Sequence, residues 1–207
     1  MNVSASPNRP VLVCASANPD KVREIELLLV GLVDLRPRPA AVPDVDETAD
    51  TLVGNARRKA QAVRDATSMA AVADDTGLFI EALPGELGVR TARYASDQPR
   101  HATDPYRANR DKLLVALSDI ADARGRRARF VTVVVVSYPD GTELVVEGEC
   151  SGTIATEERG EGGFGFDSLF VPDEGDGRTF AEMSDGEKNS LSHRARAFVA
   201  LVGALPD

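Results

Sequence analysis

One of the longest apolar runs in the chain, VTVVVV at residues 131–136, consists entirely of β-branched residues. Side chains of this type favour extended backbone, and the run is far shorter than the ~18 residues that a membrane-spanning helix needs. Pro139-Asp140-Gly141 follows as a turn signal, and residues 142–150 resume an extended pattern. We therefore predict a β-hairpin in which residues 130–138 pair with residues 142–150.

Helical and strand patterns alternate in the first half of the chain. Residues 11–15 are predicted to form a buried strand, and residues 69–73 a second strand, which runs into the sequence DDTG before residues 78–80 resume extended structure. Apolar spacing and capping residues predict helices after Asn18, after Thr48 or Asp50, at residues 104–118 and from near Gly186. This alternation, followed by a hairpin, indicates an α/β fold with a mixed sheet.

The length of 207 residues suits one domain, which we expect over residues 10–207 after a loose tail at residues 1–9. With 43% hydrophobic residues the chain can bury a core, so disorder is excluded as its main state. The net charge of −9 argues against non-specific nucleic-acid binding, and the basic cluster at 124–129 is predicted to be a solvated loop with a charged edge. The polar N-terminus lacks the apolar segment of a signal peptide, so we expect a cytoplasmic protein with no membrane partner.

Two cysteines and two histidines limit the metal chemistry of the chain. Without a Cys-x-x-Cys pair or several histidines, the sequence offers no ligand set for zinc or another transition metal. A metal would therefore be a hard ion held by carboxylates. Cys14 lies in an apolar run and is expected to be a buried free thiol.

Two segments carry groups suited to phosphate. Residues 16–21, SANPDK, connect a strand to a helix, with Asn18 as N-cap and Lys21 in the first turn. Backbone N–H groups at such a helix start bind anions, and the lysine adds a full charge. Lys59, on the second predicted helix, could project towards the same phosphates. The alternative is a capped surface helix with solvated lysines.

Acidic residues gather in two places. Asp74 and Asp75 follow an apolar strand, in which adjacent side chains point to different sides. One of them can hold a metal or activate water while the other braces a neighbouring turn. Asp44, Asp46 and Glu47 precede the second helix and could complete a magnesium site with Asp75. An Asx-type turn and a solvated acidic loop are the alternatives.

Two later segments suit a nucleobase. The sequence GGFGFD at residues 162–167 combines glycines with Phe164 and Phe166, whose flat apolar faces could stack on a base. The following helical segment includes three further candidates, Lys188, His193 and Arg194. The arginine could donate to the O6 atom of a purine. Each signal is weak alone, because Gly-rich loops and lone histidines are more often structural.

Five blocks in this order resemble the inosine triphosphate pyrophosphatases, the dITP/XTP pyrophosphatases of the Ham1-like family. They are SANPDKVREIE, ETADTLVGNARRKA, ADDTGLFIEALPGELGVRTARYA, GGFGFDSLF and AEMSDGEKNSLSHRARA. The resemblance covers about residues 10–204. It implies hydrolysis of non-canonical purine nucleoside triphosphates (ITP, dITP, XTP) to the monophosphate and pyrophosphate, which cleanses the nucleotide pool. It also implies dependence on Mg²⁺, a homodimer, and a long twisted mixed sheet with two lobes around a central cleft.

The resemblance further implies roles for individual residues. It places the phosphates at Ser16, Ala17, Asn18, Pro19, Asp20, Lys21 and Lys59. It places the metal at Glu47 and Asp75, and it makes Asp75 the proton acceptor as well. The residues that it places at the rest of the substrate are Thr76, Phe164, Gly165, Phe166, Asp167, Lys188, His193 and Arg194. Gly54 departs from the family pattern, which usually has Glu before Asn55. We therefore expect the metal or structural role of that carboxylate to fall more on Asp46, Glu47, Asp74 and Asp75.

Two other functions stay open from the sequence. A Maf-like pyrophosphatase shares the general architecture but acts on other altered nucleotides. A nucleotide sensor would keep the binding site and lack turnover. The presence of Asp75, Lys21 and the acidic group argues against the sensor.

Overall fold

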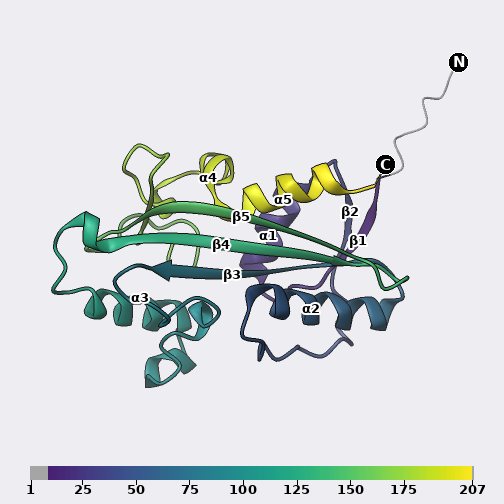
Figure 1. Ribbon diagram of the computed structural model, residues 1–207, viewed down its shortest axis with the longest axis horizontal. Helices are drawn as coiled ribbons and strands as arrows, with labels where there is room; N and C mark the ends of the chain where they lie inside the picture. Colours follow the sequence, from purple (N-terminus) through teal and green to yellow (C-terminus); the bar gives the residue numbers. More distant parts are fainter. Residues whose placement is uncertain (1–8, 207) are drawn as a thin grey trace, which may run out of the picture.

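The computed structural model describes residues 9–206, in which six strands form one mixed sheet flanked by helices (Figure 1). The strands are β1 (Val11–Cys14), β2 (Asp34–Arg36), β3 (Ala71–Ile80), β4 (Arg127–Ser137), β5 (Glu143–Ile154) and β6 (Phe170–Pro172). Their order in the sheet is β2-β1-β3-β4-β5-β6. β1 runs parallel to β2 and β3, and the other neighbours are antiparallel. The predicted α/β fold with a mixed sheet is confirmed.

The predicted hairpin forms the long central part of the sheet. β4 and β5 pair with Val134 opposite Val146 and Thr132 opposite Gly148. The turn between them places Gly141 at a φ of 87°, a left-handed conformation that glycine adopts without steric cost. Both strands extend along most of the length of the molecule, so they connect its two ends (Figure 1).

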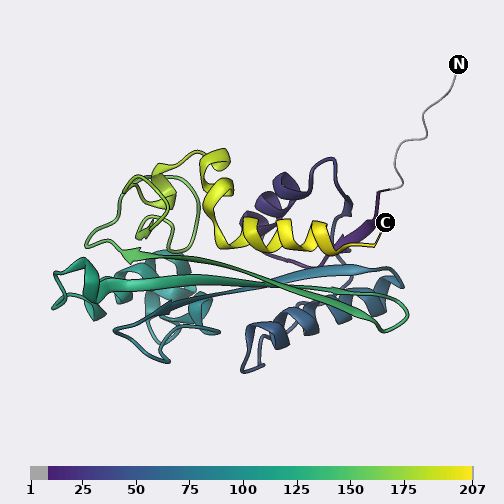
Figure 2. The same cartoon turned by 45° about the horizontal axis from the view of Figure 1, so that its top comes forward.

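Helices cover both faces of the sheet near β1. The helices are α1 (Pro19–Leu29), α2 (Leu52–Thr67), α3 (Pro105–Ala116), α4 (Asp185–Leu191) and α5 (His193–Ala204). α2 packs on one face through the predicted apolar positions Leu52, Ala56, Ala60 and Val63. α1 and α5 pack on the other face through Ile25, Leu29, Phe198 and Leu201. Figure 2 shows α1 and α5 on the opposite side of the strands from α2.

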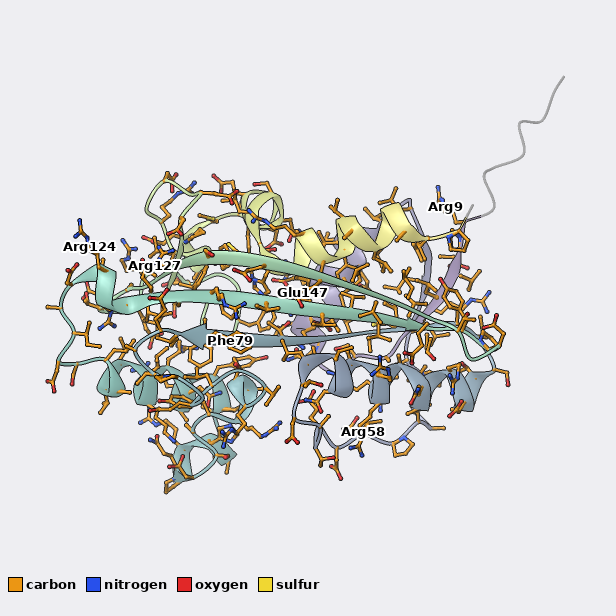
Figure 3. All side chains as sticks on the ribbon, viewed as in Figure 1. Arg9, Arg58, Phe79, Arg124, Arg127 and Glu147 are labelled. Carbon is orange, nitrogen blue, oxygen red and sulfur yellow. The ribbon has the colours of Figure 1, made fainter. Side chains whose placement is uncertain are left out.

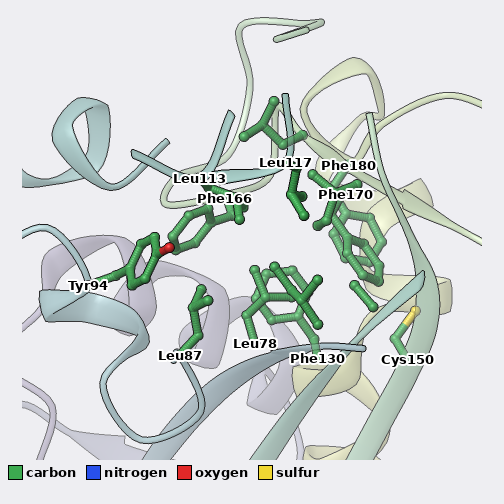
Figure 4. Close-up of a cluster of buried hydrophobic side chains, with 14 of the residues drawn as sticks. Leu78, Leu87, Tyr94, Leu113, Leu117, Phe130, Cys150, Phe166, Phe170 and Phe180 are labelled. Carbon is green, nitrogen blue, oxygen red and sulfur yellow. The ribbon is translucent and has the colours of Figure 1, made fainter. Parts of the chain in front are cut away.

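A further hydrophobic cluster, called here the far cluster, fills the end of β4 and β5 remote from β1. Leu78 of β3 and Phe130 of β4 pack there with Leu113 of α3 and with Leu117, the C-cap of that helix. The rings of Phe166, Phe170 and Phe180 complete it, as Figure 4 shows. The apolar core of the described residues thus comprises a cluster on each face of the sheet near β1 and the far cluster.

Several predicted elements need correction. β3 continues through the DDTG sequence, because Asp74 to Gly77 all pair with β4, and this pairing overrides the turn propensity of those residues. The predicted C-terminal helix is two helices, α4 and α5, separated at Ser192, whose side chain caps α5 by accepting the Ala195 N–H. β2 and β6 were not predicted, since each has three residues and no strand-length apolar pattern. Of the tail predicted at residues 1–9, residues 1–8 lie outside the described residues.

The basic cluster is more structural than predicted. Arg126 is buried and donates to the carbonyl oxygens of Leu117, Ile120, Ile154 and Ala155. Arg124 is exposed and lies at the same end of the molecule as Arg127 (Figure 3). The description of this cluster as a solvated loop is therefore wrong for Arg126. In the described part of the chain, no helix has the length and apolar character to cross a membrane.

Candidate active site

A cleft opens where β1 ends. β1 pairs with Ala71 and Val72 at the start of β3 and ends at Cys14, whereas β3 continues to Ile80. Beyond this point a cleft of ≈ 360 Å³ lies beside β3. Its lining includes Ser16, Ala17, Asn18, Lys21, Glu47, Lys59, Asp75, Thr76, Phe164, Gly165, Asp167, His193 and Arg194. The carboxyl end of a parallel strand is a frequent ligand site in open α/β sheets.

The turn from β1 into α1 has the predicted helix-start geometry. Asn18 is the N-cap, and its Oδ1 accepts hydrogen bonds from the backbone N–H groups of Asp20 at 2.9 Å and Lys21 at 3.3 Å. The Lys21 ammonium lies 3.3 Å from the Asp74 carboxylate. Burial lowers the pKa of Lys21, although Asp74 acts in the opposite direction. The turn thus brings a helix start and a lysine to one side of the cleft.

Asp74 and Asp75 diverge as predicted for neighbours on a strand. The Asp74 carboxylate is fully buried and contacts Lys21 and Arg194 on the α1/α5 side. Asp75 accepts from Asn55 at 3.2 Å and from Lys59 at 3.1 Å, both on α2. Burial disfavours the charge of Asp74, but Lys21 and Arg194 outweigh it and hold the pKa of that carboxyl well below its usual range.

Glu47 and Asp75 share one cation. The Lys59 ammonium lies 2.9 Å from the Glu47 carboxylate and 3.1 Å from that of Asp75. Burial raises the pKa of Asp75, and the nearby Glu47 adds to this effect. Burial also opposes the charge of Glu47, but Lys59 holds the pKa of that carboxyl below its usual value.

This donor set fits magnesium. Mg²⁺ prefers oxygen ligands and commonly binds one or two carboxylates together with substrate phosphates. A positive charge already lies between the two carboxylates, and both of them line the cleft. Of the other acidic candidates, Asp44 also lines the cleft but pairs with Arg38, and Asp46 is exposed.

Gly54 also has a local explanation. A Cβ atom placed at Gly54 would lie 2.7 Å from the Cβ atom of Ala49, in the segment that leads into α2. The chain therefore occupies the space that a larger side chain would need. A carboxylate at this position would require a shift of that segment.

Arg194 is held by an ion-pair network. Its guanidinium donates to Asp74 through Nε and Nη2, to Thr76 through Nη2, and to Glu24 through Nη1. The Lys188 ammonium, 2.6 Å from Asp167, also contacts Glu24. Sequence reasoning missed Glu24, which lies three residues after Lys21 on α1. Arginine carries five N–H donors, so these four bonds leave one for a ligand.

The Gly-rich loop places its two phenylalanines differently. Asp167 accepts the backbone N–H of Phe164 at 2.7 Å, and a Cβ atom at Gly163 would lie 2.1 Å from the same carboxylate oxygen, so only glycine fits there. Phe164 is half-buried and lines the cleft. Phe166 is 4% exposed, and its ring packs in the far cluster (Figure 4). Phe166 also contributes to the cleft lining, so its contact with a base stays a prediction, although most of its ring surface is covered by the far cluster.

His193 is a buried ring at the start of α5. It stacks on Phe130, with ring centroids 4.4 Å apart and an interplanar angle of 15°. Its Nδ1 has no hydrogen-bond partner among residues 9–206. Burial, with the cations of Arg194 and Lys188, holds the pKa of His193 well below its usual value. The imidazole is therefore neutral near pH 7.

The cleft differs from the predicted residue set at several positions. Pro19, Asp20 and Lys188 do not line it; Asp20 and Lys188 border a smaller neighbouring hollow. The lining adds residues that the sequence reasoning missed: Arg38, Val89, Thr91, Ala92, Tyr106, Asn109 and Phe130. Tyr106 and Asn109 come from α3, whose sequence has no motif that suggests a ligand.

Comparison with known proteins gives consistent matches. A family model described as the Ham1 family matches residues 12–204. A dITP/XTP pyrophosphatase of Streptomyces coelicolor is 43% identical over 199 residues, which covers 92% of this chain and 94% of the relative. A HAM1 protein from Coxiella burnetii superposes with a TM-score of 0.79 at 36% identity, over 94% of this chain and 97% of that chain. A dITP/XTP pyrophosphatase from Mycobacterium abscessus superposes with a TM-score of 0.69 at 40% identity, over 92% and 98% respectively.

Proposed function

The chain belongs to the Ham1 family, and from this premise we propose that it hydrolyses non-canonical purine nucleoside triphosphates such as ITP, dITP and XTP. The products are the nucleoside monophosphate and pyrophosphate. The printed names of the relatives from Streptomyces coelicolor and Mycobacterium abscessus support this substrate class. The observation that carries the proposal is the convergence of Lys21, Lys59 and Asp75 on one cleft.

The phosphates bind between the α1 start and α2. The turn at Ser16, Ala17 and Asn18 offers small side chains and a helix N-terminus, which favours negative charge. Lys21 and Lys59 approach the cleft from opposite faces of the sheet, because they contact neighbouring residues of β3. Two cations and a helix start can stabilise the charge that develops on departing pyrophosphate.

Asp75 acts on the attacking water. Its raised pKa suits a general base better than an ordinary aspartate would. The water oxygen forms a bond to the α-phosphorus while the bond from that phosphorus to the bridging oxygen of the β-phosphate breaks. The water proton passes to an Asp75 oxygen, and pyrophosphate leaves with the electron pair of the broken bond.

Glu47 and Asp75 are the residues that would hold Mg²⁺. When bound, the ion would neutralise phosphate charge beside the scissile bond. Lys59, besides its charge toward the phosphates, contacts both carboxylates and so holds them in position. Chelation of divalent metal should abolish activity, and restored Mg²⁺ should recover it.

The purine lies at the opposite side of the cleft from α2. Phe164 can stack on the base, and Lys188 and Arg194 lie 5.1 Å and 5.6 Å from the centre of its ring. The one remaining N–H of Arg194 can donate to a 6-oxo group and cannot accept from a 6-amino group. The neutral His193 ring lines the same region.

A product analysis tests this function. The enzyme is incubated with Mg²⁺ and ITP, dITP, XTP, GTP or ATP in ¹⁸O-labelled water, and each product is identified. We expect pyrophosphate and an ¹⁸O-labelled monophosphate from the first three nucleotides, with slower turnover of GTP and ATP. Release of orthophosphate would contradict the proposed bond cleavage, and tight binding of ITP without turnover would indicate the sensor.

The alternative enzyme class has its own signature. Preference for other altered nucleotides over ITP would favour the Maf-like function.

The proposal also includes the homodimer that the family resemblance implies, and a cytoplasmic location. Light scattering of the purified full chain would measure the mass of the assembly directly.

A further inference from the structure

Tyr106 joins α3 to the start of α1. Its hydroxyl accepts a hydrogen bond from Asn18 Nδ2 at 3.0 Å and donates to Asp20 Oδ2 at 2.9 Å. The residue lies in the first turn of α3, far in sequence from the turn that it contacts. Its ring lies 6.0 Å from that of Phe164, and both rings line the cleft. Tyr106 therefore touches both the phosphate side and the base side of the site.

The hydrogen bond to Asn18 has a specific consequence. The Asn18 amide uses its oxygen to cap α1, accepting from the N–H groups of Asp20 and Lys21. Its nitrogen donates to Tyr106. With both ends of the amide engaged, the side chain is fixed in its capping orientation, and the backbone of residues 16–18 is fixed with it.

We propose that Tyr106 is a positioning residue for the phosphate-binding turn, acting through Asn18 and Asp20. This inference rests on the proposed function, because it assumes that residues 16–21 bind the substrate phosphates. The ligand group affected by Tyr106 is the triphosphate or pyrophosphate group. The effect is the same for every nucleobase.

The hydroxyl acts indirectly, because its proton is already donated. A phenol has one donor, and in this arrangement that donor is bound to Asp20. Burial and the Asp20 carboxylate raise the pKa of Tyr106, against the hydrogen bond from Asn18, so the proton stays on the oxygen at neutral pH. A phosphate could take this proton only if Asp20 lost it.

Tyr106→Phe tests the proposal because it removes the hydroxyl and keeps the ring. Tyr138→Phe is the matched control, since the Tyr138 hydroxyl is buried and has no hydrogen-bond partner in residues 9–206. Steady-state kinetics on ITP, XTP, GTP and ATP would be compared with the affinity for inorganic pyrophosphate, measured by calorimetry with Mg²⁺. Thermal unfolding would report whether each variant is folded.

We expect Tyr106→Phe to bind pyrophosphate about fivefold more weakly, which corresponds to one neutral hydrogen bond. The value of kcat/KM should fall by a similar factor for all four nucleotides, and Tyr138→Phe should match the wild type. Asn18→Ala should cost more than Tyr106→Phe, and the double variant should cost little more than Asn18→Ala alone, since the hydroxyl acts partly through Asn18.

Two results would overturn the inference. One is a folded Tyr106→Phe protein with wild-type affinity for pyrophosphate. The other is an altered ratio of ITP to ATP turnover at unchanged pyrophosphate affinity, which would make Tyr106 a base-side residue. Failure of the proposed function is distinct from both, because it would appear in the wild type as absence of pyrophosphate release from every nucleotide.

Discussion

Asp74 and Asp75 are adjacent on β3, and their carboxylates contact lysines on opposite faces of the sheet, Lys21 of α1 and Lys59 of α2. The strand geometry alone separates them, since neighbouring side chains alternate. Asp74 is fully buried and contacts the cations of Lys21 and Arg194, whereas Asp75 lines the cleft. The two carboxylates should therefore respond to the same substitution in different ways.

Asp75→Asn should remove most turnover and preserve the fold. The raised pKa of Asp75 shows that the folded protein disfavours its charge, so neutralising it costs little stability. Loss of a general base lowers kcat by about 100-fold or more. Pyrophosphate release and thermal unfolding would be measured on the same preparation. A folded variant with nearly normal turnover would remove Asp75 from the mechanism.

Asp74→Asn should instead lower stability. The substitution leaves Lys21 and Arg194 buried beside a neutral group, and breaking a buried ion pair costs about 3 kcal/mol or more. The folded-state pKa of Asp74 is depressed, so this contribution is present at neutral pH and is lost as the pH falls below about 4. Denaturant unfolding at several pH values would show that the difference in unfolding free energy between variant and wild type decreases in acid. Equal stability at pH 7 would contradict the prediction.

Lys21→Ala should lower kcat/KM equally for every nucleotide. The ammonium faces the phosphate side of the cleft, and one lost stabilising donor costs about 100-fold in rate. Lys112→Ala is a suitable control, because Lys112 lies on α3 and pairs with Asp97 outside the cleft. A change in the ranking of ITP against GTP would show that Lys21 does not act through phosphate.

Local patterns predicted much of the fold because several elements are fixed by near neighbours in sequence. The hairpin follows from a β-branched run and a turn signal, and α1 follows from Asn18 and Pro19. The continuous β3 was missed because its polar residues resemble a turn, and only pairing with β4 stabilises them as a strand. Such pairing depends on residues more than 50 positions away, which local propensity does not register.

The residues of the candidate site likewise fall into those that the sequence predicted and those that it did not. Residues in motifs, such as Lys21, Asp75 and Phe164, do line the cleft. Glu24 and Tyr106 were missed, since their partners Arg194 and Asn18 lie far away in sequence. Phe166 follows the same local pattern as Phe164, and only the packing of the far cluster distinguishes the two rings.

Phe164→Ala and Phe166→Ala should therefore separate binding from stability. The Phe164 ring lines the cleft, so its loss should raise KM for all purine nucleotides by roughly tenfold, the value of one stacking contact. Phe166 is packed in the far cluster, where truncation of a phenylalanine costs about 3–5 kcal/mol. Kinetics and denaturant unfolding on both variants would measure each effect. Equal loss of stability in the two variants would contradict the assignment of Phe164 to the site.

His193 should make the protein less stable as the solution is acidified from pH 7 to pH 5. Its folded-state pKa lies well below the ordinary histidine value of about 6.5. Below that pH the unfolded chain therefore binds a proton that the folded protein does not bind. Stability therefore rises with pH through this range, with a slope of at most about 1.4 kcal/mol per pH unit from this one group.

His193→Phe keeps a ring against Phe130 and removes the titration, so its unfolding free energy should change less between pH 7 and pH 5 than that of the wild type. His101→Gln, at the other histidine of the sequence, serves as the control for loss of a histidine elsewhere in the chain. Parallel curves for wild type and His193→Phe would show that His193 takes up its proton in the folded protein.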